Sequence, residues 1–437
     1  MSSASVSLRS AAVAAGAFAL VVGSVGALHL AKLRGIRRAQ AAVEPVAMKV
    51  APRAQEGSPS SATPPFAGLD LAHVTVGATE ATAALPRERT AHLTLDVRLQ
   101  RAALAIMKRH HLPEATIVMM DADTGAILAY ASHLASGAAR DLAVEATAPS
   151  ASVFKIVTAT ALVEKEGLGP DTRACFPRSA SQRIVTSDLV VDPLRDRWCM
   201  SLATAMGKSE NAVFARLAQE KLDEPTLEAT ARAFGYGAPI AFDVPVQPGK
   251  LQIPANSGDS ALAFARTAAG FWNTTLSPLQ AAEMSATVAR GGESIRPHVV
   301  ARITSATGAV EYEASAPETH RAMSEDAARA VGAMMEHTVT EGTSYRAFHD
   351  AHHAAFVPVP VAGKTGTLTG DATGPEPRLY SWFTGFAPSR ALRPGEKRVA
   401  IAVLVVNKPR WHVKANVVAR EMLREVYRPE HAAVASR

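Results

Sequence analysis

The stretch Ser152-Val153-Phe154-Lys155, with the apolar run IVTATALV that follows it from 156 to 163, is the point from which the fold can be worked out. The run predicts a helix that ends near Gly167, and residues three apart lie on one face of a helix. The Ser152 hydroxyl and the Lys155 amine can therefore meet. An alcohol is a poor nucleophile at neutral pH, and a lysine that has lost its proton in an apolar, cation-rich pocket can activate it. About one Ser-x-x-Lys is expected by chance in a chain of this length, so the pair gains meaning only from other motifs.

Two further motifs follow this pair along the chain. Ser209-Glu210-Asn211 begins 57 positions after Ser152, in a turn between the predicted helices 202–206 and 212–222. Lys364-Thr365-Gly366-Thr367 begins 155 positions after Ser209, where a strand is expected to begin. Composition alone predicts on the order of 0.1 Lys-Thr-Gly sequences in this chain, so the three motifs in this order are a specific signal.

The ordered trio is the motif set of penicillin-binding proteins and serine β-lactamases. The sequence resembles the transpeptidase domain of penicillin-binding proteins, and the gaps between the motifs are similar to that family's. The resemblance covers about residues 67–428. It includes these flanking stretches: LTLD at 93–96, LQ at 99–100, DTGAILA at 123–129, SPLQ at 277–280, GT at 342–343 and WFTGF at 382–386.

The resemblance implies a role for each residue of the first two motifs. Ser152 would attack the carbonyl between the two terminal D-alanines of a peptidoglycan stem peptide and form an acyl-enzyme. Lys155 would take the serine proton. Ser209 would relay a proton to the leaving amine, and Asn211 would hold Lys155 and the substrate amide by hydrogen bonds.

The third motif would bind the anionic end of the substrate. Lys364 would attract the substrate and help to keep Lys155 neutral, because like charges disfavour a second protonation. Thr365, Gly366 and Thr367 would form the substrate-binding strand, with the two threonine hydroxyls on the terminal carboxylate. The backbone N–H groups of Ser152 and Thr367 would form an oxyanion hole, worth about 3–4 kcal/mol per donor. This chemistry requires no cofactor or metal.

The sequence departs from the family pattern at two positions. The family often has Pro-Gly-Ser before the lysine, whereas Ala148-Pro149-Ser150-Ala151 precedes the serine here, so we expect a different start of the helix. Glu210 places an acid beside a site that binds anions, and we expect its side chain to point to solvent.

The order of predicted elements gives the fold class. Two strands, 115–121 and 126–132, read as a hairpin around Asp123-Thr124-Gly125; many helices follow, and then strands at 381–386 and 399–406 and a helix at 415–427. Together with the resemblance, this predicts an α+β protein of the penicillin-binding/β-lactamase-like kind. An antiparallel five-stranded sheet would be flanked by helices, with an all-helical lobe inserted in the middle.

The N-terminal residues predict a membrane helix. Residues 11–31 are apolar and uncharged over about the length that spans a bilayer. They read as a signal anchor, or as a signal cleaved near Val25-Gly26-Ala27. Positive charges are more numerous after this run than before it, which by itself would leave the remaining chain in the cytoplasm. Because the substrate lies outside, we instead expect the catalytic domain outside the cytoplasmic membrane (periplasmic), single-pass or exported after cleavage.

The predicted domain boundaries follow from these observations. They are a membrane segment with its basic flank at 1–38, a linker rich in Ala, Pro and Ser at 39–66, a short pedestal at 67–110, the transpeptidase domain at 111–428 and a tail at 429–437. No glycosyltransferase domain is recognised, so a separate glycosyltransferase is an expected partner.

Composition and cysteine usage exclude other classes. The chain is 48% hydrophobic and 20% charged, as in globular proteins. Its net charge is +6, but the sequence has no run of like charges that would favour nucleic-acid binding. Cys175 and Cys199 do not form a zinc pattern; in an exported protein they could form a disulfide that braces the stretch before the second motif, or they are two buried thiols. An exposed polar loop is favoured over a metal site for His349, His352 and His353.

The leading function is a D,D-transpeptidase that cross-links peptidoglycan and is inhibited by β-lactam antibiotics. A D,D-carboxypeptidase or endopeptidase would use the same acylation residues and differ only in the acceptor, which the sequence does not decide. A β-lactamase is disfavoured, because the stretch 224–228 lacks the Asn of the deacylating loop and Asn211 stands where a second group has Val. A non-catalytic penicillin sensor would need a signalling module, and nothing before residue 39 is large enough.

Overall fold

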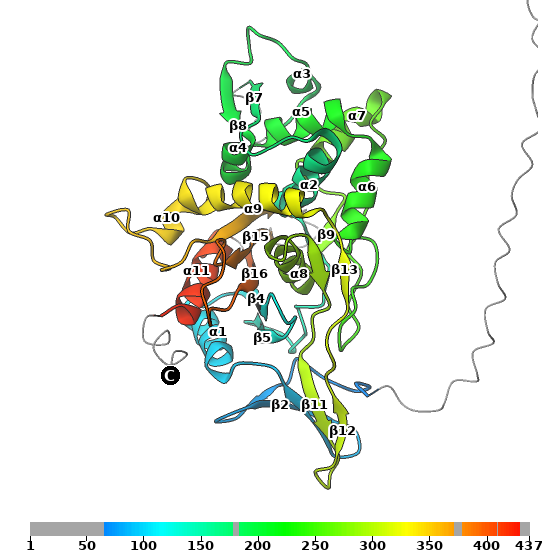
Figure 1. Cartoon of the computed structure of the whole chain (residues 1–437), viewed down its shortest axis with the longest axis vertical. Helices are drawn as coiled ribbons and strands as arrows, with labels where there is room; N and C mark the ends of the chain where they lie inside the picture. Colours follow the sequence, from blue (N-terminus) through cyan, green and yellow to red (C-terminus); the bar gives the residue numbers. More distant parts are fainter. Residues whose placement is uncertain (1–64, 178–182, 371–377, 409, 429–437) are drawn as a thin grey trace, which may run out of the picture. The chain divides into compact units, whose positions relative to one another are not determined.

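The computed structural model describes residues 65–177, 183–370, 378–408 and 410–428 (Figure 1). The predicted membrane segment at 1–38, the linker up to residue 64 and the tail at 429–437 lie outside the described residues. Within the described ranges, no helix is both long enough and apolar enough to cross a membrane.

The central sheet has five antiparallel strands in the order β14-β15-β16-β4-β5, which confirms the predicted sheet. The strands are β4 Glu114–Asp121, β5 Ile127–Leu134, β14 Ala362–Thr369, β15 Leu379–Ala387 and β16 Val399–Asn407. The β4–β5 hairpin forms early in the chain, and β16 pairs with β4 after more than 270 intervening residues. The sheet is therefore completed only by the last part of the chain.

Strand β16 shows why this sheet lies in the centre. All nine of its residues are buried. Ala402 faces the core shared with helix α8, and the next residue, Val403, faces the core shared with helices α1 and α11. A strand covered on both faces favours apolar side chains at successive positions, which explains the unbroken apolar run 399–406, and the buried Asn407 that ends the strand is hydrogen-bonded to Val413 and His412.

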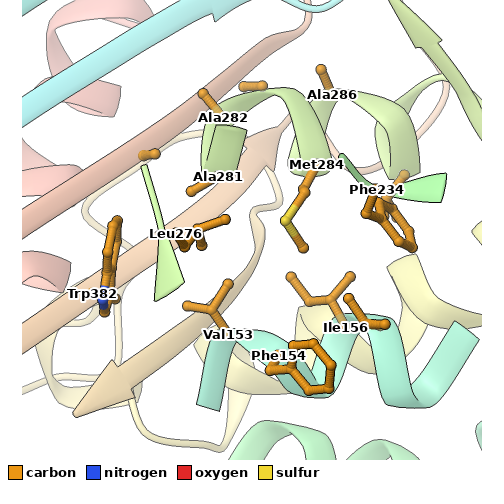
Figure 2. Packing of buried hydrophobic residues seen from close by; sticks show 14 of the residues in the cluster. Val153, Phe154, Ile156, Phe234, Leu276, Ala281, Ala282, Met284, Ala286 and Trp382 are labelled. Atoms are coloured by element: carbon orange, nitrogen blue, oxygen red, sulfur yellow. The ribbon is translucent and has the colours of Figure 1, made fainter. Parts of the chain in front are cut away.

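Helices cover both faces of the sheet. Helices α1 (Val97–Arg109) and α11 (Ala415–Val426) lie on one face, and α8 (Pro278–Ala289) lies on the other. Helix α8 begins as its sequence predicts: the Ser277 hydroxyl accepts from the Gln280 N–H at 3.1 Å, and proline occupies the first helical position. Figure 2 shows Ala281, Ala282 and Met284 of α8 packed among buried side chains.

A lobe inserted between β5 and β14 carries most of the helices (Figure 1). Its helices are α2 Lys155–Glu166, α3 Thr186–Leu189, α4 Leu202–Lys208, α5 Asn211–Lys221, α6 Glu224–Ala233 and α7 Ala261–Ala268, and α9 Glu325–Thr340 and α10 Tyr345–Phe348 follow α8. Short two-stranded pairs also occur, β6 (Ala148–Pro149) with β9 (Thr275–Leu276) and β10 (Glu293–Ile295) with β13 (Thr319–Arg321).

The prediction that this lobe is all-helical is wrong. Strands β7 (Arg173–Phe176) and β8 (Trp198–Ser201) form an antiparallel pair in which Cys175 and Cys199 are register partners and are joined by a disulfide. The predicted disulfide is thus present. Two four-residue strands have little stability alone, and their pairing depends on distant contacts that leave no periodic pattern in the sequence.

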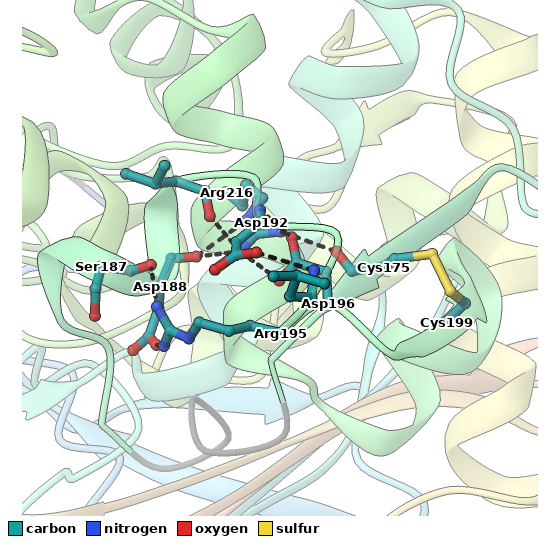
Figure 3. A network of polar contacts seen from close by, with 10 residues as sticks. Cys175, Ser187, Asp188, Asp192, Arg195, Asp196, Cys199 and Arg216 are labelled. Atoms are coloured by element: carbon teal, nitrogen blue, oxygen red, sulfur yellow. Dashed lines mark hydrogen bonds and ion pairs between the residues drawn. A yellow bond between two sulfur atoms is a disulfide. The ribbon is translucent and has the colours of Figure 1, made fainter.

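The loop between β7 and β8 is held by Arg216 of α5 (Figure 3). The Arg216 guanidinium is buried, donates to the backbone carbonyls of Asp188 and Cys175, and forms an ion pair with Asp196 at 2.6 Å. A buried charge is stable only when it is paired and hydrogen-bonded in this way. The disulfide-linked hairpin is therefore fixed to α5, the helix that begins at Asn211.

A second five-stranded sheet, absent from the sequence prediction, has the order β1-β2-β3-β11-β12. Its strands are β1 Thr75–Val76, β2 Ala81–Leu85, β3 Arg89–Leu93, β11 Val300–Thr304 and β12 Val310–Glu313. It joins the segment before α1 to the chain that follows α8. The predicted pedestal, 67–110, is consequently divided between two places, because its strands belong to this sheet whereas α1 packs on the central one.

Candidate active site

Ser152 lies in a 3-10 turn, Ala151–Phe154, directly before α2, rather than inside the α-helix that the sequence predicts. In a 3-10 helix, residues three apart lie one above the other. The Lys155 Nζ consequently donates to the Ser152 Oγ at 3.0 Å. The tighter turn brings together the two groups that the spacing had paired.

The turn packs against buried apolar side chains (Figure 2). Val153 and Phe154 are fully buried, and the Phe154 ring meets Tyr236 edge-on with centroids 5.4 Å apart. The indole N–H of Trp382, on β15, donates to the Pro149 carbonyl at 2.9 Å. Because the turn is packed on the side away from the groove, the Ser152 hydroxyl keeps a fixed place.

Ala151 stands where the Pro-Gly-Ser pattern of the family has glycine. Its φ of 49° lies in the left-handed region, which costs a residue with a Cβ about 1 kcal/mol. Its Cβ is buried against β14, so that a Cβ added at Gly366 would lie 3.2 Å from it. The altered start of the helix therefore brings Ala151 into contact with the third motif.

Lys155 is fully buried and uses all three of its hydrogens. Besides Ser152, it donates to Asn211 Oδ1 at 2.7 Å and to the Ala269 carbonyl. Burial lowers the pKa of Lys155 to about 7, although the charge of Glu210 acts in the opposite direction. A neutral amine is therefore accessible near physiological pH.

The expectation that Glu210 points to solvent is wrong. Its side chain is half-buried and caps α5 by accepting from the Ala212 N–H at 3.4 Å. A carboxylate is favoured at this position because the first N–H groups of a helix lack partners and the helix dipole is positive there. The Glu210 carboxylate thus stabilises the N-terminus of the helix that begins at Asn211.

Ser209 ends α4 in a left-handed conformation, with a φ of 58°, which turns its hydroxyl towards β14. Lys364 Nζ donates to Ser209 Oγ at 2.8 Å and to the Thr365 carbonyl at 2.9 Å. Burial lowers the pKa of Lys364 well below its usual value, and the charge of Lys155 lowers it further. Burial therefore opposes the positive charge that the sequence analysis expects on Lys364.

A close backbone contact joins the second motif to the third. A Cβ added at Gly207 would lie 2.6 Å from the His337 carbonyl oxygen, so α4 approaches α9 closely. The Gly207 carbonyl accepts from the Thr343 N–H at 2.9 Å, and the Thr343 hydroxyl lies 2.6 Å from the Thr365 hydroxyl. Thr343 thus connects the end of α4 to β14.

These elements enclose one groove of about 290 Å³. It is lined by five of the predicted residues, Ser152, Ser209, Asn211, Thr365 and Thr367. It is also lined by Thr343, Ser381, Trp382, Lys414 and Asn416.

The sequence prediction did not include Ser381, Lys414 and Asn416 among the site residues. Ser381 is the register partner of Thr367 on the neighbouring strand, and its Oγ accepts from the Ala415 N–H at 3.0 Å. Only the strand register and the docking of α11 bring these residues to the groove, so no local motif could have identified them.

Two of the three histidines of the polar loop, His349 and His353, contact Tyr345. The His349 ring stacks on the Tyr345 ring at 4.3 Å, and His353 Nδ1 lies 2.7 Å from the tyrosine hydroxyl. Within the part of the chain that the structure describes, no group of three His, Cys, Asp or Glu side chains is arranged to hold a metal ion.

The fold and the groove agree with comparison to known proteins. Residues 115–427 match the family model described as the penicillin binding protein transpeptidase domain. The chain therefore belongs to the family of penicillin-binding protein transpeptidases.

Among curated relatives, peptidoglycan D,D-transpeptidase PbpA of Mycobacterium tuberculosis is 29% identical over 285 residues, which are 61% of this chain and 51% of the relative. Penicillin-binding protein PbpB of Mycolicibacterium smegmatis is 30% identical over 268 residues, 57% of this chain and 39% of that protein. The chain spans about half or less of the length of these relatives.

The fold is similar to that of solved structures of transpeptidase domains, among them the following two. The D,D-transpeptidase domain of a peptidoglycan glycosyltransferase from Eggerthella lenta is 25% identical with a TM-score of 0.61, and the match covers 77% of this chain and 82% of that one. PBPA from Mycobacterium tuberculosis is 24% identical with a TM-score of 0.59, covering 77% and 80%.

Proposed function

We propose that this protein is a peptidoglycan D,D-transpeptidase that forms an acyl-enzyme on Ser152 and is acylated by β-lactams at the same serine. The observation that carries the proposal is the buried Lys155 amine, 3.0 Å from Ser152 Oγ, with a pKa lowered to about 7. A base whose pKa lies near the working pH combines a deprotonated form with enough basicity to accept a proton.

In the proposed acylation, Ser152 Oγ attacks the carbonyl of the D-Ala-D-Ala bond while Lys155 accepts the serine proton. The N–H groups of Ser152 and Thr367 stabilise the oxyanion. When the tetrahedral intermediate collapses, the leaving D-alanine amine takes a proton through Ser209, whose hydroxyl accepts from Lys364. The substrate carboxylate restores charge to Lys364, because a nearby anion favours the protonated amine.

The second half of the proposed reaction transfers the acyl group to an amine of another stem peptide. The name of the PbpA relatives, D,D-transpeptidase, supports this acceptor over water, which would give a D,D-carboxypeptidase. We also propose the domain boundaries given above. The segment 1–38, a membrane anchor with its basic flank or a cleaved signal, would place the catalytic domain outside the cytoplasmic membrane, and a separate glycosyltransferase would supply glycan strands.

Labelling with fluorescent penicillin tests the acylation step. The wild-type protein should be labelled and Ser152→Ala should not, with both proteins showing the same melting temperature. Labelling of neither protein would overturn the proposal. Mass spectrometry of stem-peptide products then separates the acceptors: a cross-linked dimer supports the transpeptidase, whereas release of D-alanine alone supports the carboxypeptidase.

A further inference from the structure

Lys414 lies at the edge of the groove, directly before α11. Its neighbour Ala415 donates from the backbone to Ser381 Oγ, and Ser381 is the register partner of Thr367. Neighbouring strands are about 4.8 Å apart, so α11 begins next to the substrate-binding strand. Lys414 lines the same groove as Ser152 and Thr367.

Lys414 is the groove lysine that remains available to a ligand. Lys155 and Lys364 are fully buried and donate three and two hydrogens, respectively, to protein oxygens. Lys414 is exposed, lies 5.8 Å from the Trp411 ring centroid, and has no ion-pair partner among the described residues. The described lining of the groove contains no carboxylate, so an anionic group of the ligand is the natural partner of this ammonium.

The proposed reaction shows which anion this is. The leaving group is D-alanine, an amine with a carboxylate on the adjacent carbon. The acceptor amine attacks the acyl carbonyl from the position that the leaving amine vacated, because microscopic reversibility gives the two half-reactions the same geometry. A group that holds the carboxylate of the leaving amine therefore also holds a carboxylate carried by the acceptor.

We propose that Lys414, assisted by the Ser381 hydroxyl, binds the carboxylate adjacent to the reacting amine and thereby selects acceptors that are α-amino acids. The Ser381 oxygen accepts from the Ala415 N–H, so its own O–H can donate to that carboxylate. Thr365 and Thr367 orient the same group, and the charge of Lys414 adds to that of Lys364. The inference rests on the proposed acyl transfer and identifies its acceptor class.

The transfer step balances without a further reactant. The ester bond between the acyl carbon and Ser152 Oγ breaks, and an amide bond to the acceptor nitrogen forms. The acceptor amine gives up one proton to Ser209, the reverse of the path by which the leaving amine gained one, and Lys155 returns the proton that it took to Ser152 Oγ. Lys414 contacts only the carboxylate, so its effect is confined to binding and orientation of the acceptor.

The test uses a donor without a leaving-group carboxylate, a thioester of an N-acyl-D-alanine with an uncharged thiol. The acceptors are D-alanine and D-alaninamide, which differ in the carboxylate. Mass spectrometry gives the ratio of their two amide products for the wild type, Lys414→Met, Lys414→Arg and Lys397→Met. The last variant removes an exposed lysine before β16 and matches the change in net charge.

The product ratio in favour of D-alanine should fall about three- to fivefold in Lys414→Met, the range expected for a partly exposed ion pair. Lys414→Arg and Lys397→Met should retain the wild-type ratio. Comparing each variant with the wild type cancels the difference in basicity between the two amines. A second measurement uses salt to screen the charge of Lys414 in the wild-type protein. Addition of 0.5 M NaCl should reduce transfer to D-alanine and leave transfer to D-alaninamide unchanged. This measurement tests the inference even if the Lys414→Met variant does not fold.

The outcomes separate this inference from the proposed function. If the wild type and Lys414→Met give the same ratio of the two amide products, the role of Lys414 is overturned and acyl transfer is left intact. The same conclusion follows if salt reduces transfer to both acceptors equally. Ser152-dependent hydrolysis without either amide product would overturn the acceptor site. Absence of any Ser152-dependent product would overturn the proposed function itself.

Discussion

Lys155 illustrates at the scale of a single residue how packing creates chemistry. A lysine in water has a pKa near 10.5, and burial in this site lowers it to about 7. The charged amine donates its three hydrogens to Ser152, Asn211 and the Ala269 carbonyl. The neutral amine has two hydrogens, which Asn211 and Ala269 can accept, so its lone pair can face the Ser152 hydroxyl. The cost of burying the charged form is therefore what makes the neutral base available.

The lowered pKa of Lys155 predicts the pH dependence of acylation. The neutral fraction of the amine rises with pH, so the second-order rate constant for penicillin acylation should increase through about pH 7 and level off above about pH 8. Stopped-flow labelling across this range measures it. A profile that rises only near pH 10, as for an ordinary lysine, would contradict the assignment, and Lys155→Arg should lose acylation because arginine stays protonated.

Helices α4 and α9 show how an element positions a site. Their backbones touch at Gly207 and His337, and the Gly207 carbonyl accepts from the Thr343 N–H. Ser209 ends the same helix, so its position depends on this contact. The distance between the second and third motifs is thus set by the absence of a side chain at Gly207.

Gly207→Ala should displace α4, because the new Cβ would lie 2.6 Å from the His337 carbonyl oxygen. A shift of about 1 Å at Ser209 and Asn211 should reduce the acylation rate on the order of a hundredfold. Gly332→Ala in α9 is the matched control, since its Cβ would make an ordinary contact of 3.6 Å with Phe386. Unchanged acylation in Gly207→Ala would show that the contact does not position the site.

The disulfide-linked β7–β8 hairpin gives a second prediction at this scale. The bond closes a loop across 24 positions, for which chain entropy predicts a stabilisation of about 3 kcal/mol. The double variant Cys175→Ser with Cys199→Ser should lose about this much in urea unfolding. Trypsin should also cut it faster between the two positions, since only noncovalent contacts, among them those of Arg216, then hold the described part of the loop. Equal stability of both proteins would argue against the bracing role.

At the scale of the whole molecule, one short segment of the helical lobe contacts both sheets. The Phe242 ring stacks on Tyr130 of β5 at 6.0 Å. The next residue, Asp243, is buried and accepts from the Val299 and Val300 N–H groups at 2.7 and 2.8 Å, while Arg296 pairs with its other oxygen. The lobe, the central sheet and the second sheet are thus connected at one place.

Asp243→Asn should lower the free energy of unfolding by about 2–4 kcal/mol. The amide group cannot accept from the Arg296 guanidinium and both backbone N–H groups at once, so a buried donor is left unpaired. Urea unfolding measures the loss, and the exposed Asp259→Asn is the control. Because the segment lies outside the groove, the acylation rate of the folded variant should stay within a factor of two. A loss below about 0.5 kcal/mol would contradict the connecting role.

The sequence by itself determined the features that depend on neighbouring residues. The three motifs, the β4–β5 hairpin, the start of α8 at Ser277 and the apolar run of β16 follow from spacing and periodicity. Only the tertiary structure decided which distant segments meet. The second sheet, the β7–β8 pair and the arrival of Lys414 beside Thr367 depend on strand register and helix docking. Periodicity reports whether a side chain is buried, and it carries no information about the partner that buries it.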